Sequence, residues 1–89
     1  VLMMHIGGRP GKYDWKARDL IAKYHPDIFV CGHSHILMVK NDSAAGLLYI
    51  NPGACGIQGW HIERTALRVH IDGENIHGME LFRESRTLK

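Results

Sequence analysis

The amino-acid sequence predicts an α/β fold in which a strand–helix–strand (βαβ) unit is followed by β-hairpins. Three patterns support this fold class. An amphipathic segment with helical periodicity lies between two short apolar runs, two further apolar runs flank a cluster of turn-forming residues, and an alternating segment ends at Asp72-Gly73. With 89 residues, the chain has room for one small domain at most.

The βαβ unit is predicted from the N-terminal third of the chain. Residues 1–4 are apolar and predict a strand, and residues 6–11 are rich in glycine and predict a flexible loop. Asp14 is a good N-cap, and the segment after it places apolar side chains on one helix face, at Ala17, Leu20, Ile21 and Tyr24. Pro26 cannot continue this helix, so residues 27–31 are predicted to form a second, buried strand.

Two hairpins are predicted after the βαβ unit. The apolar runs 36–39 and 47–50 are separated by turn formers at 41–46, which predicts the first hairpin. Residues 63–71 alternate between apolar and polar side chains, and the Asp-Gly pair that follows predicts a return strand over residues 76–82.

The composition is that of a soluble globular protein and gives no support to nucleic-acid or membrane binding. Eleven Lys and Arg against nine Asp and Glu give a net charge of 11 − 9 = +2, without the basic stripe that follows a phosphate backbone. No apolar run approaches the roughly 20 residues that a membrane-spanning helix requires. Cys31 and Cys55 each lie in apolar, glycine-containing surroundings, so we expect two buried free thiols and a reducing cytoplasm.

Three histidines are predicted to meet at one edge of the sheet. His5 follows the first strand of the βαβ unit, and His33 and His35 follow the second strand. The carboxyl ends of parallel strands lie at the same sheet edge, where α/β proteins usually bind their ligands. Because neutral imidazole is a common ligand of transition metals, the pattern favours a metal site. The alternative is that His5 is a buried histidine with satisfied hydrogen bonds and that the other two cap a turn.

At these residues the chain resembles the calcineurin-like metallophosphoesterases, in particular the small bacterial and archaeal phosphodiesterases of that superfamily. The last two metal motifs of the family are a strand ending in His-Gly or a close variant and a strand followed by Gly-His-Ser/Thr-His. They correspond here to Met4-His5-Ile6-Gly7 and Gly32-His33-Ser34-His35. A third shared feature, a strand entering Asn-Pro-Gly-Ser, stands here as Ile50-Asn51-Pro52-Gly53-Ala54. Three ordered matches make the resemblance specific.

The resemblance implies an α+β sandwich of the metallophosphoesterase type with two divalent ions, typically Mn, Fe, Zn or Ni. His5 and His33 would bind one ion and His35 the other. A bridging hydroxide would attack the phosphorus of a small phosphate ester, more specifically a phosphodiester. Asn51 and Gly53 would line the site from below. Arg9 is a further candidate for a phosphate contact, because it lies in the glycine-rich loop after His5.

The family's N-terminal motifs, Asp-x-His, Gly-Asp-x-x-Asp and Gly-Asn-His-Asp, have no counterpart in this sequence. With them the bridging carboxylate, an Asn ligand and the histidine that protonates the leaving group are missing, so no catalytic residue is assigned here. We therefore expect residues 1–89 to be the C-terminal portion of one metallophosphoesterase domain, inactive alone and prone to form homo-oligomers through an exposed sheet edge. The rival function is a non-catalytic protein-binding scaffold with the same fold.

Overall fold

The computed structural model of this protein describes residues 1–56, 59, 62–73 and 75–85. Over these residues the chain forms one helix and eight strands, which are arranged as one four-stranded sheet and two two-stranded sheets. Within the same residues, no helix is long and apolar enough to cross a membrane. The mixed α/β architecture confirms the predicted fold class.

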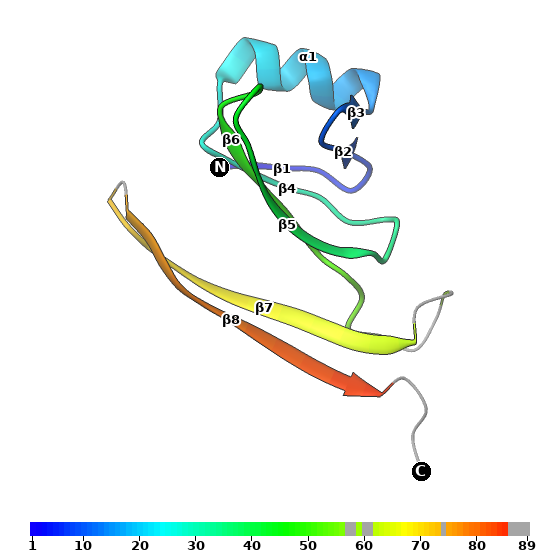
Figure 1. Ribbon diagram of the computed structural model, residues 1–89. Coiled ribbons are helices and arrows are strands. Elements are labelled where there is room, and N and C mark those ends of the chain that lie inside the picture. The colour runs from blue at the N-terminus through cyan, green and yellow to red at the C-terminus, as the bar shows by residue number, and fades with distance from the viewer. Residues whose placement is uncertain (57–58, 60–61, 74, 86–89) are drawn as a thin grey trace.

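The four-stranded sheet contains the two strands of the predicted βαβ unit and the two strands of the first hairpin (Figure 1). Its strand order is β1 (Leu2–Met3), β4 (Ile28–Val30), β6 (Leu47–Pro52) and β5 (Leu37–Asp42). β1 pairs with β4 in parallel, and β5 pairs with β6 antiparallel, as predicted. The parallel pairing of β4 with β6 was not predicted. Through this pairing the first hairpin joins the same sheet as the two strands of the βαβ unit.

Helix α1 (Trp15–Tyr24) connects β1 to β4 and begins where the sequence predicts. The Asp14 side chain accepts a hydrogen bond from the Lys16 backbone N–H at 3.2 Å, which caps the helix. Ala17 and Ile21 are buried against the sheet, but Tyr24 is 61% exposed. The predicted apolar stripe is therefore wrong at Tyr24, which is the last residue of the helix.

The loop predicted at residues 6–11 is more ordered than expected. Its second half belongs to a small hairpin, formed by β2 (Gly8–Arg9) and β3 (Lys12–Tyr13). The Asp14 N–H donates to the Gly7 carbonyl at 3.0 Å, so this hairpin leads directly into helix α1. Glycine content alone did not distinguish a flexible loop from a short hairpin.

The core lies between helix α1 and one face of the four-stranded sheet. It is a single cluster of buried residues, namely Ala17, Ile21, Phe29, Cys31, Leu47 and Tyr49. Cys31 is a buried free thiol, as predicted. Cys55 is also free but exposed, so the prediction of burial is wrong there, because the segment after β6 leaves the sheet.

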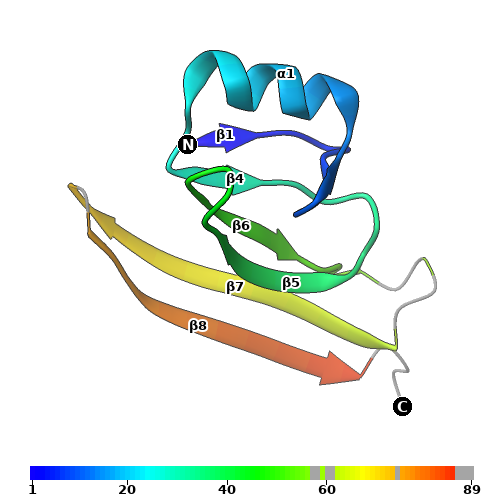
Figure 2. The same cartoon turned by 45° about the horizontal axis from the view of Figure 1, so that its top comes forward.

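The predicted second hairpin is present as β7 (Glu63–Asp72) and β8 (Asn75–Ser85). It lies on the opposite side of the four-stranded sheet from α1 (Figures 1 and 2). Thr65 attaches it to the end of β6, since its N–H donates to Ala54 O at 2.8 Å and its hydroxyl donates to Pro52 O at 2.7 Å. A side chain at Gly53, which has a φ of +77°, would collide with the Thr65 hydroxyl.

Candidate functional site

The parallel ladder continues past the ends of β1 and β4 and fixes the two loops that carry the histidines. The Met4 N–H donates to Val30 O at 2.9 Å, and the Gly32 N–H donates to His5 O at 3.0 Å. His5 and His33 therefore follow strand ends that are hydrogen-bonded to each other. This is the sheet edge at which the sequence places them.

The imidazoles of His5 and His33 converge at this edge. His5 Nε2 lies 3.2 Å from His33 Nδ1, and the two rings meet edge to face with centroids 5.1 Å apart. Both side chains are exposed to solvent. In neutral rings this spacing is a hydrogen bond, with one nitrogen donating and the other accepting.

The same spacing fits two ligands of one metal ion. Two nitrogens that bind an ion at about 2.0–2.1 Å lie about 3 Å apart when the angle at the ion is near 100°. The His5–His33 separation of 3.2 Å is close to this distance. A pair of neutral imidazoles brings no negative charge, so carboxylate ligands from elsewhere would be needed to balance two dications.

His35 does not join this pair in the structure. Over the described residues, no group of three or more His, Cys, Asp or Glu side chains is spaced to hold a metal ion. His33 and His35 both adopt left-handed backbone conformations, with φ of 68° and 62°. Such values are uncommon outside glycine and cluster at functional sites, where the surrounding structure must maintain them.

Asn51, at the end of β6, holds the histidine loop from beneath. Its amide nitrogen donates to Gly32 O at 3.3 Å and to Ser34 Oγ at 3.0 Å, and its amide oxygen accepts from the Gly53 N–H at 3.0 Å. The residue is 1% exposed. Its side chain is thus fully engaged with protein groups, which makes Asn51 a positioning residue for the loop.

A cavity of about 450 Å³ opens beside His33. Its apolar walls include Ile6, Ile36 and Met38, and its lining also contains Arg9 and Lys12 from the β2–β3 hairpin. Arg9 thus lines the same cavity as His33. Gly53 does not line this cavity; it packs against Thr65 instead.

Two tyrosines that the sequence analysis did not single out, the buried Tyr49 and the half-buried Tyr13, hold the hairpin that forms part of this cavity's wall. The Tyr49 hydroxyl donates to Gly8 O at 2.7 Å, and the Tyr13 hydroxyl donates to Asp42 Oδ2 at 2.7 Å. Burial, which disfavours the phenolate, and the neighbouring Cys31 raise the pKa of Tyr49 to about 12. The Tyr49 hydroxyl therefore stays protonated at neutral pH and can donate its hydrogen bond. A tyrosine in an otherwise aliphatic strand is a signal for such a buried polar contact.

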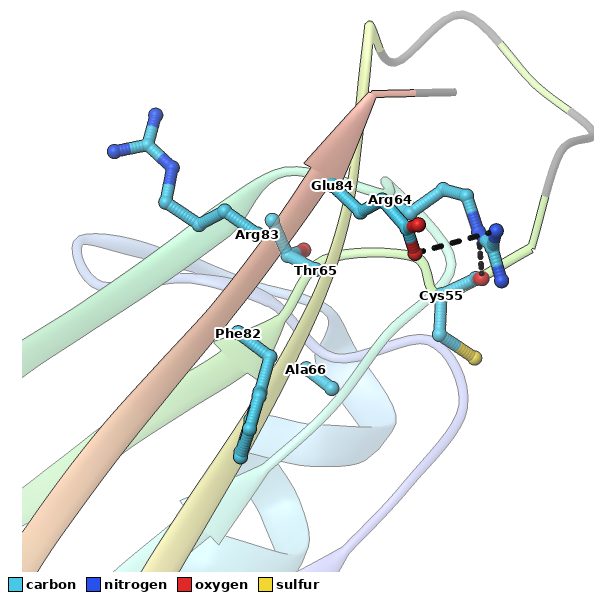
Figure 3. A pocket seen from close by; sticks show the side chains of 7 residues that line it. All are labelled: Cys55, Arg64, Thr65, Ala66, Phe82, Arg83 and Glu84. Carbon is cyan, nitrogen blue, oxygen red and sulfur yellow. Dashed lines mark hydrogen bonds and ion pairs between the residues drawn. The ribbon is translucent and has the colours of Figure 1, made fainter. Parts of the chain in front are cut away.

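A second cavity, of about 380 Å³, lies between the segment after β6 and the β7–β8 hairpin (Figure 3). Its lining contains Cys55, Phe82 and Arg64. The Arg64 guanidinium donates to Cys55 O at 2.8 Å and pairs with Glu84 at 3.5 Å, as the dashed lines in Figure 3 show. Because the Arg64 guanidinium is engaged in this way and none of the three histidines lines this cavity, it is the weaker candidate.

The comparison with known families agrees with the site. A family model described as the calcineurin-like phosphoesterase superfamily domain matches residues 1–74, a range that includes all three histidines. No curated protein and no solved structure gives a significant match. At the level of the family, the match indicates a phosphoesterase, which is a hydrolase. The matched range, the mixed α/β architecture and the histidine-bearing strand ends together establish that the chain belongs to the calcineurin-like phosphoesterase superfamily.

Proposed function

We propose that this chain provides histidine ligands to the two-metal centre of a phosphodiesterase. The observation that carries the proposal is the convergence of His5 and His33 at 3.2 Å on the carboxyl ends of two parallel strands. Membership of the superfamily supports phosphoester hydrolysis as the reaction class. In this proposal His5 and His33 hold one divalent ion and His35 approaches the second.

The proposal includes a division of labour within one domain. This chain is the C-terminal portion, and a preceding segment of the domain supplies the carboxylates and the group that protonates the leaving oxygen. The divalent ions, manganese being our first choice, would lower the pKa of an attacking water and offset charge on the phosphoryl oxygens. The residues of this chain orient the site: Asn51 sets the histidine loop, and Arg9 binds an anionic oxygen of the substrate.

The experiment is metal analysis of the complete domain and of its histidine variants. His5→Ala, His33→Ala and His35→Ala should each lower manganese affinity by about tenfold or more and should lower hydrolysis of bis(4-nitrophenyl) phosphate in parallel. The matched control is the pair His70, on β7, and His77, on β8. Their rings stack with centroids 5.5 Å apart, away from the candidate site. Alanine at these positions should change neither quantity, and equal losses at both pairs would refute the ligand assignment.

A second candidate function is a non-catalytic scaffold for protein binding. The observation in its favour is that, over the described residues, no group of three or more metal-binding side chains forms. Against it stands the convergence of His5 and His33, because a scaffold has no chemical requirement for convergent imidazoles. Metal content decides between the two, since a complete domain that binds no divalent ion at saturating manganese would support the scaffold.

A further inference from the structure

The hairpin β2–β3 carries two cations whose charge no described part of the protein neutralises. Arg9 and Lys12 face each other across the hairpin register, and within the described residues neither forms an ion pair. Both line the cavity beside His33. A cation pair beside an apolar cavity is a binding arrangement for an anion that is attached to an apolar group.

A neighbouring cavity adds a third positively charged side chain to this surface. A third cavity, of about 340 Å³, shares Arg9, Lys12 and Met38 with the cavity beside His33 and adds Lys40, from β5. Asp42, on the same strand, accepts a hydrogen bond from Tyr13, and the charge of Lys40 also helps to lower the pKa of this carboxyl, so Asp42 offsets part of the Lys40 charge. Lys40 thus adds a third cation near Arg9 and Lys12, and the apolar side chain of Met38 lines both cavities.

The hairpin is held in place before any ligand binds. Tyr49 bonds to Gly8 O at 2.7 Å at the start of the hairpin, and Tyr13, at its end, bonds to Asp42 on β5 at 2.7 Å. Gly7 is buried, and a Cβ there would lie 2.5 Å from the Phe29 ring. A binding element that is already ordered loses little conformational entropy on association.

We propose that the β2–β3 hairpin recognises a second anionic group, carried by the organic arm of the phosphoester. The inference rests on the proposed function, since it places the scissile phosphorus at the histidines. The apolar part of the arm occupies the cavity lined by Ile6, Ile36 and Met38, and its distal anion meets Arg9, Lys12 and Lys40. The preferred substrate class is therefore a diester whose organic arm is apolar and negatively charged at its far end.

The test measures binding in metal-free buffer, so that it does not depend on the metal centre. The probes are methyl 4-carboxyphenyl phosphate and its 4-carbamoylphenyl analogue, which have the same shape and differ in one charge. The complete domain should bind the carboxylate about three- to tenfold more tightly, because two or three partly exposed cations contribute modest energies each. At about 0.5 M salt the preference should shrink, since exposed charges are screened.

Charge-matched variants assign the effect to the hairpin. Arg9→Ala and Lys12→Ala should each reduce the preference for the carboxylate, whereas Arg18→Ala and Lys23→Ala, which remove the same charges from exposed positions on α1, should preserve it. Equal binding of the two probes, no binding of the carboxylate at about 10 mM, or equal effects of hairpin and helix variants would overturn the proposal. A domain that keeps the preference but lacks manganese-dependent hydrolysis would instead refute the proposed function alone.

Discussion

Replacing Asn51 by alanine should loosen the histidine loop without touching either imidazole. The Asn51 amide makes three hydrogen bonds, to Gly32 O, Ser34 Oγ and the Gly53 N–H, at 3.0 to 3.3 Å. The variant leaves two acceptors and one donor without this partner. Each bond contributes about 0.5–1.5 kcal/mol net. Water reaches the exposed Ser34 side and replaces part of the loss, so we expect a decrease of about 2–3 kcal/mol in the free energy of unfolding.

The effect on metal binding follows from the backbone conformation. His33 and His35 have positive φ values, which the loop must maintain against their cost. Without Asn51 the loop relaxes, and manganese affinity should fall by about tenfold or more, as is usual for groups that orient metal ligands. Asn51→Asp keeps the bond to the Gly53 N–H but loses both donor bonds, so its metal affinity should fall as well.

Urea unfolding and manganese titration of the complete domain check both effects. The matched control is Asn41→Ala, an exposed residue of β5 whose side chain makes no hydrogen bond recorded in the described part of the structure. It should change stability by less than about 0.5 kcal/mol. Manganese affinity equal to that of the unmodified domain, in an Asn51→Ala variant that is destabilised, would show that the loop does not depend on Asn51 for its ligand geometry.

Three further predictions concern pH and completeness. The hydrogen bond from Tyr13 lowers the pKa of Asp42, so this pair stabilises the fold above about pH 4. Tyr13→Phe should cost about 1 kcal/mol at pH 7 and less as the pH falls through the depressed pKa, as acid-unfolding curves of the two proteins would show. Burial raises the pKa of Tyr49 to about 12, so its contribution is complete below about pH 10 and is lost as the pH rises through 12; Tyr49→Phe should flatten alkaline unfolding over that range. The isolated 89-residue chain should show no manganese-dependent hydrolysis of bis(4-nitrophenyl) phosphate, and activity that survives further purification would contradict the division of the site.

The sequence was sufficient to predict elements whose signal is local. The N-cap at Asp14, the break at Pro26 and the Asp72-Gly73 turn each depend on a few neighbouring residues, and the structure confirms the elements they delimit. The pairing of β4 with β6 depends on contacts between distant segments, which apolar runs do not encode. Tyr24 has the correct periodicity but is exposed at the last position of the helix, so periodicity alone did not determine its burial.

The candidate site was predictable where topology determines it. Two parallel strands joined by a helix bring their carboxyl ends together, and this brings His5 near His33 although 28 residues separate them. The supporting residues were not predictable in the same way. The position of Lys12 at the cavity and the hydrogen bond of Tyr49 to Gly8 both require a short hairpin that the glycine-rich sequence did not reveal. The hydrogen bond between Asn51 and Ser34 requires the turn geometry of the histidine loop.

The histidine loop balances backbone strain against the hydrogen bonds beneath it. Two non-glycine residues in left-handed conformations cost about 1–2 kcal/mol each, which is close to the stabilisation expected from the three Asn51 bonds. Glycine at positions 33 and 35 would avoid the cost but would bring no imidazole. The loop therefore keeps the strained backbone together with the two imidazoles. Asn51 offsets the cost of this strain from a buried position, where its own side chain does not interfere with metal binding by the histidines. Such an arrangement is expected where the chemistry of the side chain, rather than the turn, determines the residue.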